Sequence, residues 1–142
     1  MIVGFPGETV SDFEETLSLA KTVRYHSMFS FKYSERPNTL ASKRQTDDVA
    51  ESEKTRRIVS LQQLQKNLQA EIHKRSIGST VEVLVDSTSR KRSWELAGRT
   101  SGNTVVNFEA SKELLGCFAQ VQITKSGPFS LHGKLVQTTV KA

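Results

Sequence analysis

The stretch GSTVEVLVD at residues 78–86 marks the point where the hydrophobic period of the chain changes to two. Val81, Val83 and Val85 occupy every second position, as they do in a strand with one buried face. Four further short strands follow, at residues 95–100, 104–108, 118–124 and 131–138, and glycines at 98, 102, 116, 127 and 133 permit bends or tight turns between and within them. Closure is the usual way for so small a sheet to remove its edges. We therefore predict a five-stranded antiparallel, OB-like β-barrel over residues 78–142.

Working back from Gly78, the pattern is helical. Ile58, Leu61, Leu64, Leu68 and Ile72 are spaced 3, 3, 4 and 4 residues apart, and Gln, Lys and Arg fill the other positions. This spacing predicts a helix over residues 49–75, about 40 Å long at roughly 1.5 Å per residue. We interpret residues 47–77 as a linker helix whose apolar stripe packs on a neighbouring domain.

The first 34 residues predict a strand, a helix and a second strand. Residues 1–5 are apolar, Thr9 and Asp12 form a capping-box pattern before a helix at 11–24, and residues 27–34 alternate in hydrophobicity. Such βαβ units normally have parallel strands covered by helices on both faces. This unit is too small to bury those faces, so we interpret residues 1–46 as the torn edge of a larger α/β barrel. Its aromatic side chains are expected to lack burial partners: Phe5, Phe13, Phe29 and Phe31. Residues 35–48 are predicted to form a loop. With the βαβ unit, the long helix and the barrel, the predicted fold class is α+β.

Composition excludes several classes of protein. The 142 residues contain one cysteine, Cys117, so the chain alone can hold neither a disulfide framework nor a 4Fe-4S cluster. No apolar run approaches the length of a membrane span, and the first residues do not resemble a signal peptide, which favours a cytoplasmic location and no membrane partner. The formal charge is +5, and the basic excess lies entirely after residue 34. That distribution is consistent with a polyanion partner for the later part of the chain.

Two segments carry candidate binding residues. Arg90, Lys91, Arg92 and Trp94 lie between the first two barrel strands, where the cations could grip phosphates while the indole stacks on an unpaired base. A solvated loop whose Trp94 folds back onto the barrel is an equal alternative. Arg99 and Asn103 flank the next turn and could extend the same face, although Asn103 also suits a left-handed turn position.

The second segment is the turn Gly4-Phe5-Pro6-Gly7-Glu8-Thr9, which precedes a helix N-terminus. Its glycines allow close approach of a ligand to the backbone, but taken alone one such glycine pair favours an ordinary turn between a strand and a helix. The three histidines lack metal-ligand spacing, and the sequence contains no self-sufficient catalytic constellation.

Taken together, these motifs resemble a known family. The runs MIVGFPGET (1–9) and FSFKYSERPNTLA (29–41) look like the end of the radical-SAM core of bacterial tRNA methylthiotransferases of the MiaB type. The later runs, around Gly78-x-x-Val81, Gly98-Arg99-Thr100 and Leu131-x-Gly133, resemble their C-terminal TRAM domain, a small RNA-binding β-barrel.

The resemblance implies a parent enzyme that uses S-adenosyl-L-methionine and two 4Fe-4S clusters to methylthiolate isopentenyladenosine in tRNA, although this chain holds no cluster. It places Gly4, Pro6, Gly7 and Glu8 near the S-adenosylmethionine pocket. It gives the TRAM residues a tRNA anticodon-arm role: Arg90, Lys91, Arg92, Trp94, Arg99 and Asn103. We expect a monomer. The alternatives are a free-standing RNA-binding TRAM protein and a methylthiotransferase acting on another tRNA nucleoside or on ribosomal protein S12.

Overall fold

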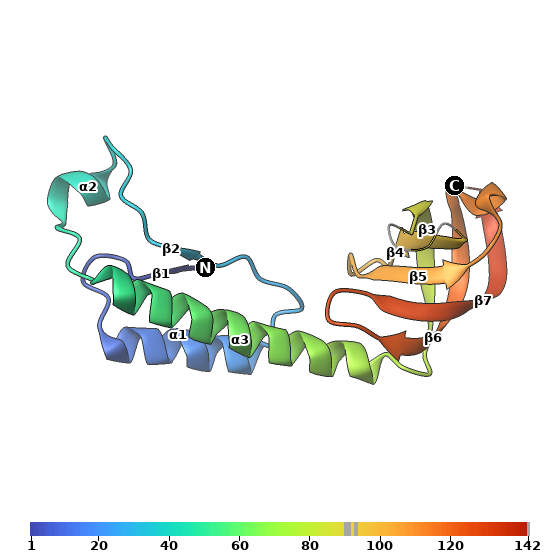
Figure 1. Cartoon of the computed structure of the whole chain (residues 1–142), viewed down its shortest axis with the longest axis horizontal. Coiled ribbons are helices and arrows are strands. Elements are labelled where there is room, and N and C mark those ends of the chain that lie inside the picture. The colour runs from blue at the N-terminus through green and yellow to red at the C-terminus, as the bar shows by residue number, and fades with distance from the viewer. Residues whose placement is uncertain (90–91, 93, 142) are drawn as a thin grey trace. The chain divides into compact units, whose positions relative to one another are not determined.

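A computed structural model describes residues 1–89, 92 and 94–141 (Figure 1). The chain forms two compact units, Met1–Gln69 and Ala70–Ala142. The long helix α3 (Glu51–Arg75) contributes residues to both units. In the part of the chain that the structure describes, no helix combines the length and the apolar character that a membrane crossing requires.

The first unit begins with the predicted strand, helix and strand. These are β1 (Ile2–Val3), α1 (Val10–Val23) and β2 (Phe31–Lys32), and β1 pairs parallel with β2. Helix α1 starts where the capping box predicts, because the Thr9 side chain accepts the Asp12 amide and the Asp12 carboxylate accepts the Thr9 amide. Hydrogen bonds donated to the Asp12 carboxylate by the Thr9 amide, and then by the Thr9 hydroxyl, lower the pKa of Asp12. The parallel pairing is confirmed, whereas the larger barrel remains a prediction.

The core of the first unit is built by three elements. Val3 of β1, Phe13 of α1, and Ile58 and Leu61 of α3 are buried in one cluster. Phe13 was expected to lack burial partners, and that prediction is wrong because the apolar stripe of α3 packs against the same core. Phe5, Phe29 and Phe31 are exposed, as expected, and Phe29 is 84% exposed.

A short helix, α2 (Leu40–Arg44), lies where the sequence predicts only loop. Thr39 caps it by accepting the Ser42 amide at 3.2 Å. The helix buries no residue, so it carries no apolar periodicity by which the sequence could reveal it. Just before it, Asn38 adopts a φ of +67°, a left-handed conformation that asparagine tolerates better than most residues.

Two buried cations of α3 hold the turn after β1. The Arg57 guanidinium lies 3.1 Å from the Glu8 carboxylate, donates to the Glu8 carbonyl at 2.9 Å, and pairs with Glu53 at 2.8 Å. Lys54 pairs with Asp47 at 2.5 Å, and its aliphatic stem occupies the space where a side chain at residue 4 would stand. Gly4, with φ +71°, therefore suits the turn both by conformation and by size.

The pairing of Glu53 predicts a pH dependence for the first unit. Hydrogen bonds from Arg56, and then from Arg57, lower the Glu53 pKa from 4.5 to about 2. Because the folded pKa lies below the unfolded one, the stabilisation is present above about pH 4.5 and is lost as the pH falls toward about 2. We expect Glu53→Gln to lower the melting temperature near neutral pH and to match the parent near pH 2. Melts followed by circular dichroism across this range test it, and parallel curves at every pH would contradict it.

The second unit is a closed barrel of five strands in the ring order β3-β4-β5-β7-β6 (Figure 1). The strands are β3 (Thr80–Thr88), β4 (Glu95–Arg99), β5 (Val105–Glu109), β6 (Cys117–Ser126) and β7 (Leu131–Lys141), with a single 3₁₀ turn, η1 (Lys112–Leu114), before β6. The predicted strand positions and closure are confirmed. The prediction of a wholly antiparallel barrel is wrong, because β5 pairs parallel with β7. A ring with an odd number of strands cannot alternate direction throughout, so at least one pair must be parallel.

The barrel interior is apolar and closely packed. Its buried cluster includes Val83, Val106, Phe108 and Val121. Cys117 is buried and free, as predicted for a small hydrophobe. Gly98 lies where β4 approaches β3, and a Cβ there would stand 2.5 Å from the Val83 Cγ1 and closer still to the Leu84 carbonyl oxygen. The glycine is therefore required by close packing.

Candidate nucleic-acid interface

One outer face of the barrel is formed by the second, third and fifth strands. Successive side chains of a strand point to opposite faces. Leu96, Val106 and Phe108 lie in the core, so the side chains between them face outward. Registered outward pairs join β4 to β5 at Ala97 and Asn107 and join β5 to β7 at Asn107 and His132. The small side chain of Ala97 lies between Glu95 and Arg99 on β4, which leaves a hollow over the middle of the face.

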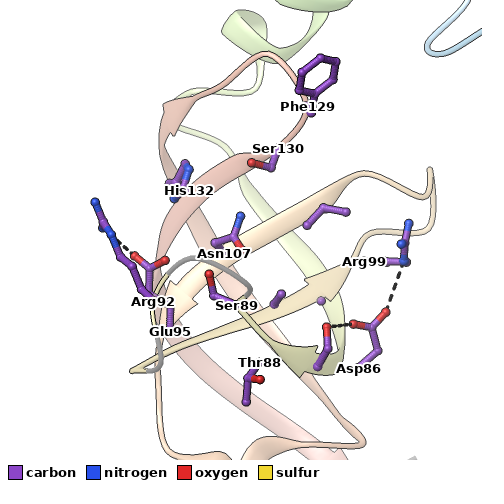
Figure 2. Close-up of a pocket in the computed structure, with 14 residues that line it drawn as sticks. Asp86, Thr88, Ser89, Arg92, Glu95, Arg99, Asn107, Phe129, Ser130 and His132 are labelled. Atoms are coloured by element: carbon purple, nitrogen blue, oxygen red, sulfur yellow. Dashed lines mark hydrogen bonds and ion pairs between the residues drawn. The ribbon is translucent and has the colours of Figure 1, made fainter.

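We call the first hollow the Phe129 groove (Figure 2). Its volume is about 490 Å³. It is lined by the end of β3, by the outward face of β4 and β5, and by the two flanking loops; its lining residues with charged, aromatic or hydrogen-bonding side chains include Asp86, Ser89, Arg92, Glu95, Arg99, Asn107, Phe129, Ser130 and His132. Figure 2 shows Phe129 at one end and the Arg92–Glu95 pair at the side, with Asn107 between them. Cations, an aromatic ring and amide groups therefore surround one open hollow.

A second hollow, the Lys134 groove, continues from the first. It shares Arg92, Glu95, Asn107 and His132 with the Phe129 groove and extends to Lys125 and Lys134. Both lysines are exposed on the neighbouring strands β6 and β7. The two hollows form one continuous track across β4, β5 and β7, with cationic side chains at intervals.

Each arginine of the track is held by a carboxylate. Arg92 pairs with Glu95 at 2.9 Å, and Arg99 lies 3.3 Å from Asp86 and donates to the Asn103 side chain at 2.8 Å. Asp86 stands at an irregularity in the β3–β4 register, between Val85 and Ser87. Bulges of this kind redirect a side chain out of the regular alternation. The guanidinium groups remain about half exposed, so they are oriented yet accessible to an anion.

Comparison with known proteins bears directly on this barrel. Residues 74–136 match the family described as the TRAM domain. This match spans most of the barrel and less than half of the chain. The chain is also 47% identical over 137 residues to the tRNA-2-methylthio-N(6)-dimethylallyladenosine synthase of Salmonella arizonae. Enzymes of the same name from Salmonella paratyphi B and Salmonella newport are 46% identical over the same length.

These alignments cover 96% of this chain and 29% of each relative. The chain therefore spans less than a third of the length of the curated relatives that it matches, and it is homologous to their C-terminal region. The resemblance drawn from the sequence motifs is confirmed.

The structure brings only some of the predicted RNA-binding residues together. Arg92 and Arg99 both line the Phe129 groove of the barrel. Trp94 is 62% exposed, so it does not fold back into the barrel, but it lines neither groove. Asn103 has φ +61°, so it occupies a left-handed turn position, and its side chain also accepts a hydrogen bond from Arg99. Arg90 and Lys91 lie outside the described residues. RNA binding by these side chains remains a prediction.

The sequence did not predict three residues of the grooves. Phe129 is 72% exposed on the loop between β6 and β7, and Asn107 and His132 meet across the parallel pair. The loop signal was present, because Gly127 and Pro128 precede an unpaired aromatic. The Asn107–His132 contact was not visible, because it depends on the parallel register.

The predicted cofactor turn has partners within the chain. The Gly4 amide donates to the Glu8 carboxylate, and the Gly7 amide donates to Asp48 at 2.7 Å. Those amides are therefore already used. No group of three or more metal-ligating side chains occurs within residues 1–89, 92 and 94–141.

Proposed function

We propose that the TRAM barrel binds single-stranded RNA along the track formed by the Phe129 and Lys134 grooves. The track combines arginine and lysine side chains with an exposed aromatic ring, and these are the groups that bind phosphates and stack on unpaired bases. In OB-like barrels, oligonucleotides bind on the face of the second and third strands between the first and fourth loops. Here those elements are β4, β5 and the loops that carry Arg92 and Phe129.

We further propose that this chain is the C-terminal part of a tRNA-2-methylthio-N(6)-dimethylallyladenosine synthase. The observation that carries this proposal is the similarity to such enzymes over 96% of the chain. The RNA would then be the anticodon arm of a tRNA, whose loop offers unstacked bases to the track.

The catalytic cofactors of such an enzyme do not fit this chain. The sole cysteine, Cys117, is buried in the barrel, and a 4Fe-4S cluster needs three or four thiolates. In this proposal the clusters belong to the remainder of the protein. The first unit would form an edge of a larger radical-SAM barrel, with Ile2, Phe29 and Phe31 covered there. Gly4, Pro6, Gly7 and Glu8 would then border the S-adenosylmethionine pocket through backbone shape, since the Gly4 and Gly7 amides are occupied.

A free-standing RNA-binding TRAM protein is the second candidate. It agrees with the lack of a metal-ligand cluster in the part of the chain that the structure describes, as the first candidate does. The groove and its RNA chemistry are common to both candidates. Sequencing of the gene upstream of the Met1 codon separates them, because the synthase requires an in-frame extension with cluster cysteines.

The RNA-binding proposal predicts a change in salt dependence. Replacing both Arg92 and Arg99 with Gln removes two phosphate-binding groups, so the slope of log affinity against log salt should fall by about 1.4, at roughly 0.7 per contact with single strands. Titration of a fluorescent anticodon stem-loop at several salt concentrations measures this slope. A duplex of equal length should bind more weakly, since its bases are not available to the groove.

The matched control removes two cations from the first unit. Arg56 and Lys66 are exposed side chains of α3, and replacing both with Gln changes the net charge by the same amount. This variant should keep the parental slope. The assignment of the grooves fails if the Arg92 and Arg99 variant also keeps that slope, or if both variants lose it equally.

A further inference from the structure

A buried histidine supports the loop that carries Phe129. His73 lies in the last turn of α3 and is 1% exposed. Its Nδ1 is 2.9 Å from the carbonyl oxygen of Gly127. A carbonyl oxygen can only accept, so Nδ1 carries the hydrogen in this contact and donates it to the loop. The helix therefore makes a directed hydrogen bond to the connection between β6 and β7.

Both backbone polar groups of Gly127 form hydrogen bonds. Its carbonyl accepts from His73, and its amide donates to the Ser130 carbonyl at 2.8 Å, which closes the turn. Pro128 and Phe129 form the tip between these two bonds, and Phe129, which is 72% exposed, lines one end of the groove (Figure 2). The ring position consequently depends on how firmly the turn is anchored.

The position of His73 is itself fixed, because backbone hydrogen bonds attach the end of α3 to the barrel. Directly after α3, the Gly78 amide donates to the Ile123 carbonyl at 2.8 Å, and the Ile123 amide donates to the Ser79 carbonyl at 2.8 Å. These bonds tie the end of the helix to β6, the strand that leads into the turn. His73 thus links two segments that the barrel already holds at constant separation.

We propose that His73 is a positioning residue for RNA recognition: its bond to Gly127 holds Phe129 ready to stack on an unpaired base. The inference rests on the proposed RNA-binding function. His73 is buried beneath the loop, so it touches no RNA and acts through Phe129. Its effect should therefore appear in base stacking and not in phosphate binding.

Two substitutions of the full chain separate the hydrogen bond from the volume of the ring. His73→Phe keeps a ring of similar size but removes the donor, and His73→Asn places an amide nitrogen close to the Nδ1 position. Stacking on an aromatic side chain is worth roughly five-fold or more in affinity per base. We expect His73→Phe to weaken binding of a single-stranded oligoribonucleotide by about as much as Phe129→Ala, with an unchanged salt slope. His73→Asn should recover most of the loss.

A double-mutant cycle gives the decisive readout. If His73 acts through Phe129, the double variant His73→Phe, Phe129→Ala binds no more weakly than Phe129→Ala alone. Losses that multiply, or parental affinity in His73→Phe, would overturn the proposal. If His73→Phe fails to fold, His73→Leu, which also lacks the donor, completes the same cycle with and without Phe129→Ala.

Hydrogen exchange tests the anchor without RNA. The Gly127 amide should exchange faster in His73→Phe than in the parent, and His73→Asn should restore its protection. Unchanged exchange would overturn the positioning role. Faster exchange together with no RNA binding by the parent chain would instead overturn the proposed function, and with it the stacking role, while the anchor itself stands.

Discussion

Gly98→Ala should destabilise the barrel by about 3 kcal/mol, at the upper end of the cost of overpacking a core. The added methyl would stand 2.5 Å from the Val83 Cγ1 and closer to the carbonyl oxygen of Leu84. That oxygen belongs to the β3 backbone, so it cannot move aside as a flexible side chain can. Strands β3 and β4 must separate, and the hydrogen bonds between them weaken.

Gly102→Ala is the matched control for this prediction. Gly102 lies in the turn after β4, where an added Cβ would come no closer than 3.8 Å to the Thr100 Oγ1. Denaturant unfolding followed by the fluorescence of Trp94, the sole tryptophan and a barrel residue, measures both variants. Equal unfolding midpoints for Gly98→Ala and the parent would contradict the close-approach argument. An equal loss in Gly102→Ala would attribute the effect to glycine flexibility instead.

Arg57→Met should cost the first unit roughly 3 kcal/mol, the lower end of the range for breaking a buried ion pair. The Arg57 side chain is 4% exposed, and its loss leaves the largely buried Glu8 carboxylate without its cation. It also removes the hydrogen bond to the Glu8 carbonyl, which ties the turn after β1 to α3. Methionine preserves much of the volume above the Phe13 ring, so the loss reports on charge and hydrogen bonding more than on packing.

Arg56→Met provides the comparison, because Arg56 is adjacent and pairs with the same Glu53. Its side chain is 55% exposed, so its ion pair is screened by water and its loss should lower the melting temperature far less than the loss of Arg57. Thermal melts followed by helical circular dichroism report on the first unit, where most helical residues lie. Similar melting temperatures for the two variants would show that burial of Arg57 does not matter.

Much of the architecture is predicted by short sequence patterns, each of which involves residues close together in the chain. The capping box at Thr9 and Asp12, the leucine spacing of α3 and the alternation after Gly78 each predict an element close to its observed bounds. Each of these signals is local, because burial of one face imposes its period on neighbouring residues. Helix α2 is not predicted by the sequence, because it buries no residue and therefore has no hydrophobic pattern.

The candidate site was harder to predict because it is assembled across strands. Arg92 and Arg99 were found through their charge, whereas Asn107 and His132 become neighbours only through the parallel register of β5 and β7. A wholly antiparallel barrel does not contain that register. Five strand directions cannot alternate around a ring, so the number of strands itself requires a parallel pair. The turn at Gly127 was predictable, but its anchor to His73 joins residues 54 positions apart.

The closed ring also affects how cooperatively the second unit unfolds. Every barrel strand has two neighbours, whereas β1 and β2 have only each other within the described residues. No barrel strand can therefore fray from an edge, and freeing one breaks ladders on both of its sides. The seam between β5 and β7 also joins segments separated by η1 and the whole of β6, so it forms only when distant parts of the chain meet. Local fluctuations cannot open the track by releasing a single strand: the face persists as long as the ring is closed, and it disappears with the ring as one event.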